Sequence, residues 1–488
     1  MRRIRWLLLA VQAALVTAFL IGLRSRRMPL GVPGEWEWQR IIASPSAGSI
    51  ALGFAAIGLY AAFAAVGFGA MSRQTRPPRV KRWLLGLVLA AVALQGAVQE
   101  AAPEGYGLSK WILALHSPGS SGYYTVAKQQ MADPWRFLAN YPTWIAKQDA
   151  LHVGTHPPGL FVAAKASLSL MERDARLSRW VCEYAPGSAA PAIRTFRESM
   201  NLTRADAASL ALTGALTLLA CASAVVPIYA LARSTLTAGE SWAAAALWPL
   251  VPSALMFQPA ADTAFPLFSS TALAMAAWSV RADTRHGLAL CVLSGLVLAV
   301  GMACTLAFLP VGLVVAIVLF PGQVSNFDRR IKQILATGVG FLAGTLAWWA
   351  ATAANPFAIW WINKENHARF YVEYPRTFAA WVVENPIELA VALGLPTAAW
   401  ALVGLFRGWQ APRVAWGTLL VLVALTLSGK NLSEVARLWL PLMPPLLVAA
   451  GAGLGWSGGG GRTLGASIAL VGLQVLVLEA TIQVVYPV

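Results

Sequence analysis

The sequence predicts an all-α polytopic membrane protein with about thirteen transmembrane helices and its N-terminus inside. Three observations lead to this prediction: the composition, the number of long apolar runs, and the distribution of basic residues. Of the 488 residues, 58% are hydrophobic and 12% are charged, and the mean hydropathy is +0.61. Soluble globular proteins carry about 25% charged residues, so a water-soluble enzyme is excluded. The apolar runs are also too long for a disordered chain.

Thirteen apolar segments approach the length of about 20 helical residues that crosses a bilayer core. The least distinct separation lies at Ala303–Thr305, between the seventh and eighth segments. No small-residue cleavage site follows the first segment, so we expect a retained anchor and not a removed signal peptide. The thirteen segments are residues 6–23, 48–71, 83–99, 205–232, 241–258, 264–281, 287–303, 305–320, 333–353, 387–406, 413–428, 437–454 and 464–483.

Basic residues give the predicted orientation. With the N-terminus inside, the inner segments hold 17 basic and three acidic residues, whereas the outer side and its helix ends hold 20 basic and 18 acidic residues. This asymmetry is typical of cytoplasmic loops. The pI of about 10.2 therefore follows from the topology. Nucleic-acid binding would need an exposed basic domain with interleaved aromatic residues, and the sequence contains none, so we expect no nucleic-acid partner.

The cysteines predict neither a disulfide framework nor a zinc site, because they are scattered without metal-ligand spacing. Three of the four lie inside apolar runs, where a small buried thiol is the ordinary interpretation. They are Cys182, Cys221, Cys291 and Cys304.

Polar sequence is concentrated on the predicted outer side, in loops at residues 100–204, 259–263 and 354–386 and in the short segment Lys430–Arg437. Binding and catalytic residues tend to lie in such connecting segments. In the first loop, Asp149, His152 and His156 precede Pro157-Pro158-Gly159. The apolar run Leu160–Met171 that follows is too short to span a membrane. We expect it to form an interfacial helix that begins at the proline pair.

This loop resembles that of the GT-C superfamily of integral-membrane glycosyltransferases, and specifically the protein O-mannosyltransferase and lipid-A aminoarabinose transferase branch. The resemblance rests on three landmarks in order: Asp149 with His156-Pro157-Pro158-Gly159, VPIYALAR at Val226–Arg233 before a helix that ends at Asp262-Thr263, and EVARLWLPLMPP at Glu434–Pro445. It covers residues 83–488, which it predicts to be a GT-C-like transmembrane glycosyltransferase domain. Residues 1–82 would then be two additional N-terminal transmembrane helices.

The resemblance implies transfer of a sugar from a polyprenyl-phosphate donor to an acceptor hydroxyl, with inversion, on the extracytoplasmic face. It further implies a bacterial-type plasma (inner) membrane, a role in the cell envelope, and a glycan, lipid or protein as acceptor. Members of the family usually carry an acidic pair after the preceding span, where this chain has Glu100 and Glu104, followed by Tyr123. The catalytic base therefore stays open among Asp149, Glu104 and Glu100. Because Asp-x-Asp is absent, the sequence supports no divalent metal or other cofactor.

The chemistry of such a transfer needs a base for the acceptor proton and cationic groups for the departing phosphate. A partly desolvated carboxylate at the membrane boundary is a suitable base, which makes Asp149 and Asp262 candidates. Arg437 at the mouth of a predicted span is a candidate phosphate ligand. The remaining candidate ligands are Glu434, His152, His156, Tyr123, Lys364, His367 and Arg369.

Each candidate has a structural alternative. Asp149 is equally suited to cap the segment that begins at Ala150, Asp262 to sit in a solvated turn, and Glu434 with Arg437 to form an i,i+3 ion pair. A transporter or lipid flippase without transferase chemistry is the alternative function. It would be expected to carry charged residues in mid-span and broken helices near the bilayer centre. A scaffold subunit without chemistry of its own is a third hypothesis.

Overall fold

The computed structural model describes residues 2–25, 28, 30–73, 77–320, 327–406 and 412–485. It is all-α and 77% helical, which confirms the predicted class. The strands among the described residues form two antiparallel pairs. β1 (Gly31–Val32) pairs with β2 (Trp36–Glu37), and β3 (Gln39–Arg40) pairs with β4 (Ile482–Gln483) near the C-terminus.

Seven helical segments in the described residues are long and apolar enough to cross a membrane. They consist of α1 (Arg2–Arg24), α2 (Ala47–Arg73), α3 (Pro77–Gln99), α11 (Arg204–Ser223) with α12 (Val225–Arg233), α16 (Thr284–Met302), α18 (Phe327–Thr352) and α25 (Gly461–Thr481). An eighth would be α20 (Phe378–Leu393) with α21 (Leu395–Phe406), which are bent by 108° at the break between them. The polytopic membrane class is therefore supported.

Every other predicted span also contains helix, but in shorter or broken pieces. These pieces are α13 (Ala238–Leu247), η1 (Trp248–Leu250), α14 (Pro252–Met256), α15 (Phe265–Ser279), α17 (Phe308–Leu319), α22 (Arg413–Leu427), α23 (Val435–Leu438), η4 (Leu440–Leu442) and α24 (Met443–Trp456). The break after Ala303 separates α16 from α17 as expected. The number of thirteen spans stays a prediction.

The main core runs through the whole bundle, including its N-terminal helices. α2 packs against α3, α13 and α25, and α1 packs against α21 and α25. The predicted boundary at residue 82 falls inside α3, and the hydrophobic core continues across it. Small residues allow close helix contact, as is common in membrane bundles. An added Cβ on Gly404 of α21 would lie 1.9 Å from the carbonyl oxygen of Ala449 in α24.

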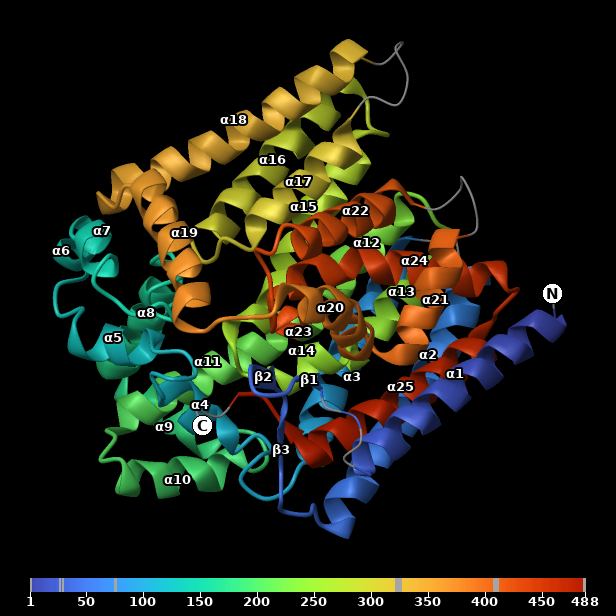
Figure 1. The fold of residues 1–488 in the computed structure, drawn as a ribbon, viewed down its shortest axis with the longest axis horizontal. Helices are drawn as coiled ribbons and strands as arrows, with labels where there is room; N and C mark the ends of the chain where they lie inside the picture. Colours follow the sequence, from blue (N-terminus) through green and yellow to red (C-terminus); the bar gives the residue numbers. More distant parts are fainter. Residues whose placement is uncertain are drawn as a thin grey trace.

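The first long loop folds into a group of short helices on one side of the bundle (Figure 1). They are α4 (Lys110–His116), α5 (Tyr123–Gln129), α6 (Pro134–Ala139), α7 (Tyr141–Ile145), α8 (Gly159–Arg173), α9 (Ala175–Glu183) and α10 (Ala189–Ser199). Only α8 was identified from the sequence, as the expected short helix after the proline pair. In the third loop, α19 (Pro356–Glu373) lies against α7.

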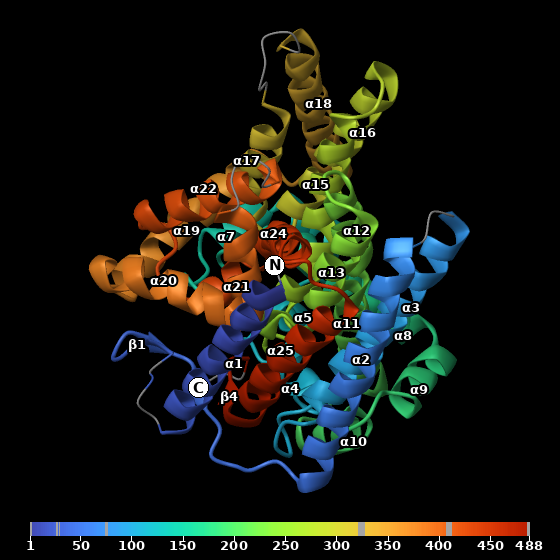
Figure 2. The ribbon, with the colours of Figure 1, turned by 90° about the vertical axis from the view of Figure 1, so that its right-hand side faces the viewer.

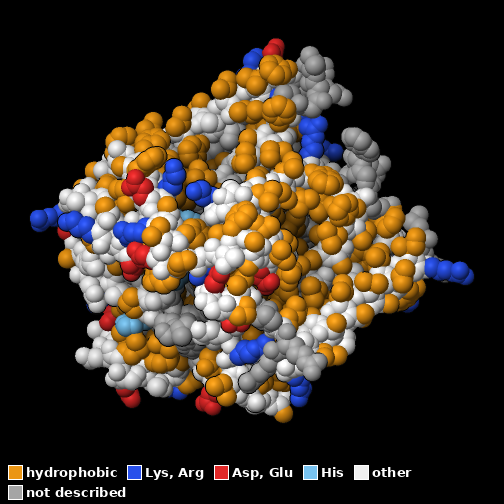
Figure 3. Space-filling model, viewed as in Figure 1, with side chains coloured by type: hydrophobic (Ala, Val, Ile, Leu, Met, Phe, Trp, Pro, Cys, Tyr) orange, Lys and Arg blue, Asp and Glu red, His pale blue; other side chains and the backbone are white. Residues whose placement is uncertain are grey.

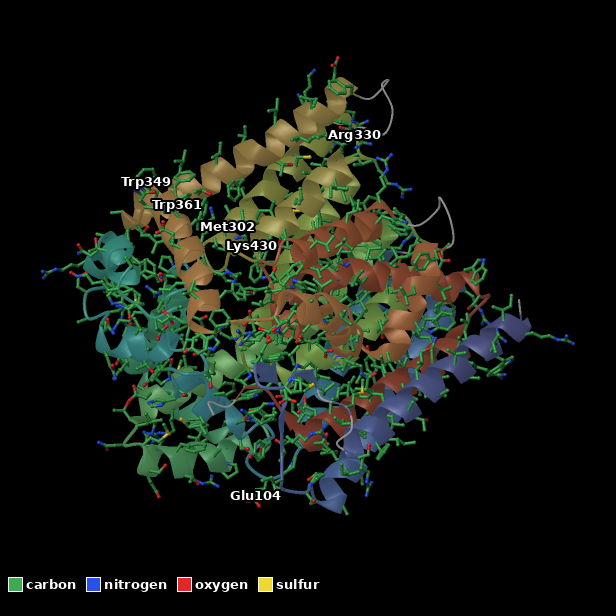
Figure 4. All side chains as sticks on the ribbon, in the orientation of Figure 1. Glu104, Met302, Arg330, Trp349, Trp361 and Lys430 are labelled. Carbon is green, nitrogen blue, oxygen red and sulfur yellow. The ribbon has the colours of Figure 1, made fainter. Side chains whose placement is uncertain are left out.

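Hydrophobic side chains cover a broad area of the face in Figure 3, and Lys and Arg side chains lie at several of its margins and in its left and lower parts. Arg330 lies at one end of the molecule and Glu104 at the opposite end (Figure 4). The predicted topology requires this separation, since it assigns the two residues to opposite sides. The α16–α18 pair projects from the rest of the bundle (Figure 2).

Candidate functional site

The segment that carries the two histidines is held by one face of α19. Asn363 and Asn366 both donate hydrogen bonds through Nδ2 to the carbonyl oxygen of Gly154, at 3.2 and 2.7 Å. Arg369 donates through Nη2 to the carbonyl oxygen of Gln148 at 2.5 Å. Because these residues are three apart, they lie on neighbouring turns of the helix. The loop is thus fixed by backbone contacts that do not use the histidine rings.

Glycines allow the close approaches that this segment needs. An added Cβ on Gly154 would lie 1.8 Å from the carbonyl oxygen of Asp149, so no larger residue fits the turn. Gly159 donates its N–H to the carbonyl oxygen of Ala303 at 2.7 Å, and an added Cβ there would lie 2.5 Å from the same oxygen. The Pro-Pro-Gly sequence therefore anchors the loop to the turn between α16 and α17.

Arg437 is the central cation of the site. Its Nη2 donates to Oε2 of Glu434 at 2.6 Å, and its Nη1 donates to Nδ1 of His152 at 3.3 Å. The Arg437 side chain is 17% exposed. Its Nε is buried and has no hydrogen-bond partner among the described residues. The guanidinium also lines the cavity described below, where its exposed part is available to an anion.

Asp262 lies in the turn η2 (Ala261–Ala264), which packs against α23 and η4. Its charge acts on Arg437, on His156 and on Tyr123. The ring of Tyr123 lies edge-on to that of His156 at 5.6 Å between centroids. Three separate parts of the chain, the first long loop, η2 and the start of α23, thus bring their polar groups together.

A cavity of about 100 Å³ opens between the first long loop, α19 and the segment Leu432–Leu438, and no residue of η2 is in its lining. This is smaller than the roughly 300–1,000 Å³ of sites that enclose a whole small molecule, but it has room for a phosphate-sized group. Its polar lining consists of His152, Thr155, His156, His367, Tyr371, Ser433, Glu434 and Arg437. Lys430 lies beside this region (Figure 4), and its carbonyl oxygen accepts a hydrogen bond from the Tyr371 hydroxyl at 3.1 Å.

The histidines in this cavity are neutral near pH 7. Burial, together with the charges of Arg437 and His156, lowers the pKa of His152 well below its usual value. Burial also lowers the pKa of His156, although the nearby Asp262 acts in the opposite direction. For His367, burial and then Lys430 lower the pKa. The net charge around the cavity is therefore set by Arg437, Lys430, Glu434 and Asp262.

None of the other candidate acids is in the lining of the cavity. Asp149 directly precedes the lining residue Ala150, is exposed, and accepts the N–H of Leu151 through Oδ1 at 3.0 Å, so it caps a turn at this point of the loop. Glu100 accepts the N–H of Ser188 at 2.7 Å and holds a turn of the first loop. Glu104 is exposed and lies at the far edge of the molecule (Figure 4). The structure does not bring any of the three to Arg437.

Two of the basic candidates on α19 also point elsewhere. Lys364 is exposed and lies over the ring of Trp361 at 4.6 Å. Arg369 pairs with Glu373 at 3.2 Å in addition to its contact with Gln148. Of the predicted group on this helix, only His367 lines the cavity.

Sequence reasoning missed the residues that hold the site in place. Asn363 and Asn366 carried a usable signal, since two amides three residues apart lie on one side of the helix. Tyr371 carried none, because its partners are backbone groups of the segment Lys430–Leu432.

No cluster of three or more His, Cys, Asp or Glu side chains suited to a metal ion occurs in the part of the chain that the structure describes. No family model matches the chain, and no curated protein matches it.

Proposed function

We propose that the protein is a membrane glycosyltransferase that moves a sugar from a polyprenyl-phosphate donor to an acceptor hydroxyl on the extracytoplasmic face. The observation that carries this proposal is that Arg437, Glu434, His152 and His156, from two distant segments, line one phosphate-sized cavity. The charge of Asp262 in η2 acts on both Arg437 and His156. A guanidinium that lines the cavity and a nearby carboxylate are the two elements that displacement of a sugar phosphate requires.

The lipid part of the donor also has a suitable surface. A crevice lined by Pro157, Pro158, Ala303 and Trp360 begins one residue from His156. Its lining is largely apolar, and it lies next to α16 and α18, whose outer faces are hydrophobic. The crevice itself has a volume of only about 10 Å³, so an isoprenoid chain would lie along the outer faces of α16 and α18 beside it, with its phosphate toward the cavity.

In the proposed reaction the acceptor oxygen attacks the anomeric carbon of the sugar. The bond from that carbon to the phosphate oxygen breaks, and the phosphate leaves with the bonding electron pair, held by Arg437. The acceptor proton passes to the carboxylate of Asp262. His156 would contribute a hydrogen bond at the rim of the cavity. The thirteen-helix GT-C-like architecture, the inner-membrane location and the acceptor class belong to the same proposal.

The test is a transfer assay in proteoliposomes with a panel of radiolabelled polyprenyl-phosphate sugars. Asp262→Asn should lower turnover about 100-fold or more, as expected for loss of a general base. Arg437→Ala should raise the apparent KM for the donor. The matched controls are Arg176→Ala, on the exposed face of α9, and Asp149→Asn, since asparagine caps a turn as well as aspartate does. Wild-type kinetics for both site variants would overturn the proposal.

One observation favours the alternative, a transporter or lipid flippase. α20 and α21 form a broken pair bent by 108°, and Glu388 of α20 is buried. Broken helices and buried charges are typical of transport sites. Movement of intact polyprenyl-phosphate sugar across proteoliposomes, with no cleavage of the sugar bond, would select this function instead.

A further inference from the structure

The segment between α1 and α2 is fastened to one face of α20. Glu35 accepts hydrogen bonds from the backbone N–H of Thr377 at 3.0 Å and from Nε1 of Trp381 at 2.6 Å. Gly31 donates its N–H to Glu384 at 3.2 Å. Trp381, Glu384 and Glu388 follow one another at spacings of three and four residues, so they lie on a single helix face. Residues 31–38 cover that face.

Glu388 is the innermost residue of this contact, and it is 4% exposed. Its Oε1 accepts Nε1–H of Trp38 at 3.4 Å and the backbone N–H of Ala436 at 3.1 Å. Its Oε2 is buried with no hydrogen-bond partner among the described residues. Burial of a carboxyl group is costly unless hydrogen bonds compensate for the lost hydration. An apolar side chain at position 388 could not accept these two hydrogen bonds.

The hydrogen bond from Ala436 to Glu388 stabilises the start of α23. This helix has only four residues, and its first backbone N–H groups have no partner within it. Ordinarily the N-cap side chain accepts one of them, but the N-cap residue Glu434 makes no such bond, because its carboxylate is paired with Arg437. Glu388 accepts the N–H of Ala436 in its place. The cap of α23 is thus supplied from another helix.

The backbone before α23 is under strain. Ser433 and Glu434 have φ angles of 75° and 55°, in the left-handed region that side-chain-bearing residues rarely adopt. Such conformations persist only when their surroundings impose them. Here the Ala436 N–H is fixed by Glu388, directly beside Arg437. Loss of that bond would release the one turn that aims the guanidinium at the cavity.

We propose that Glu388 is a positioning residue that caps α23 from α20, and that Trp38 fixes Glu388 in turn. The consequence, which rests on the proposed function, is that the segment 31–38 helps to set the affinity of the anion site without touching the anion. Arg437 remains the residue that binds; Glu388 and Trp38 act through it.

The experiment measures binding of farnesyl phosphate to the detergent-solubilised full chain. Glu388→Ala removes the acceptor for the Ala436 N–H and should weaken binding about tenfold, the effect of one lost hydrogen bond of roughly 1.4 kcal/mol. Glu388→Gln keeps an acceptor oxygen and should stay within about threefold of wild type. Trp38→Phe should give an intermediate loss. Val383→Ala is the matched control, because Val383 is an exposed residue on another face of α20.

A second measurement does not depend on the ligand. Hydrogen–deuterium exchange of the peptide that spans residues 433–438 should accelerate in Glu388→Ala but not in Glu388→Gln or Val383→Ala. If Glu388→Ala binds the probe with wild-type affinity and shows unchanged exchange, the positioning role is overturned. If wild-type protein does not bind the probe while Glu388→Ala still accelerates exchange, the positioning role is supported and the proposed function fails.

Discussion

The hydrogen bonds of Arg437 and of the two histidines fix which ring nitrogens carry protons. A guanidinium only donates, so Nδ1 of His152, 3.3 Å from Arg437 Nη1, accepts and is unprotonated. Nδ1 of His156 lies 2.7 Å from the carbonyl oxygen of His152 and therefore carries a proton. Each neutral ring thus has one defined tautomer. Protonation of His152 would place its Nδ1–H against the N–H of Arg437 Nη1, so that two donors would face each other beside a buried cation.

This arrangement predicts a loss of stability in acid. The pKa values of His152 and His156 are lowered in the folded protein, whereas in the unfolded chain histidines titrate near 6.5. Their contribution to stability is complete above about pH 6.5 and is lost as the pH falls through the folded values. We expect the unfolding temperature in detergent to drop between pH 7.5 and pH 5. His152→Asn keeps an acceptor for Arg437 but does not titrate, so it should show a smaller drop.

The control for this measurement is His286→Asn, which changes an exposed histidine in the first turn of α16. It should reproduce the wild-type dependence on pH. Equal slopes for wild type and His152→Asn would show that the tautomer assigned to His152 is wrong.

For individual residues, the sequence predicted part of the site. His152, His156, His367, Glu434 and Arg437 were chosen for their residue types on one predicted side, and the structure brings all five to one cavity. The acids were harder to choose, since a carboxylate that caps a turn and one that serves as a base look alike in a sequence. Glu388 was missed, because an acid inside an apolar run has a meaning only once its partner Ala436, 48 residues away, is known.

Among the helices, the pair α16 and α18 shows how an element is attached through two glycines. An added Cβ on Gly295 would lie 2.1 Å from the carbonyl oxygen of Thr337, and one on Gly340 would lie 2.1 Å from that of Val292. The two backbones are therefore in direct contact, as small residues allow in membrane bundles. Most of the remaining surface of α18 is not buried in the bundle.

Gly340→Val should therefore separate α16 from α18. Excess volume at a tight contact costs about 1–3 kcal/mol or more, so we expect a lower unfolding temperature in detergent. Gly338→Val is the matched control on the same helix, since nothing lies within 4 Å of the position of its Cβ. Similar unfolding temperatures for the two variants would show that this contact does not hold α18.

The apolar segments were readily found from the sequence, but their breaks were not. Residues 387–406 were predicted as one span, whereas the structure divides them into α20 and α21 at Gly394, whose φ is 92°. A glycine in an apolar run can continue a helix or end it, and neighbouring elements decide between the two outcomes. In this case the amide of Gln474 in α25 accepts the N–H of Leu395 at 2.9 Å, at the start of α21.

For the molecule as a whole, the uneven distribution of charge predicts how it lies in the membrane. We expect Asp328, beside Arg330, and Glu104 to face opposite compartments, since they belong to opposite predicted sides and Arg330 and Glu104 lie at opposite ends (Figure 4). In a background without the four native cysteines, Glu104→Cys should react with an impermeant maleimide in intact cells. Asp328→Cys should react only after the membrane is opened. Labelling of both from outside would refute the orientation.

The pairing of β3 with β4 ties residue 39 to residue 483, where Gln483 donates a hydrogen bond to Gln39 at 3.0 Å across a sequence separation of 444. During synthesis β3, which follows Trp38, is therefore made long before β4, its partner near the end of the chain. Long-range pairings of this kind form late. Nearly all of the helices would be synthesised before β3 and β4 can pair, so newly made chains should pass through a stage in which the helices are formed but residues 39–40 are not yet held in place.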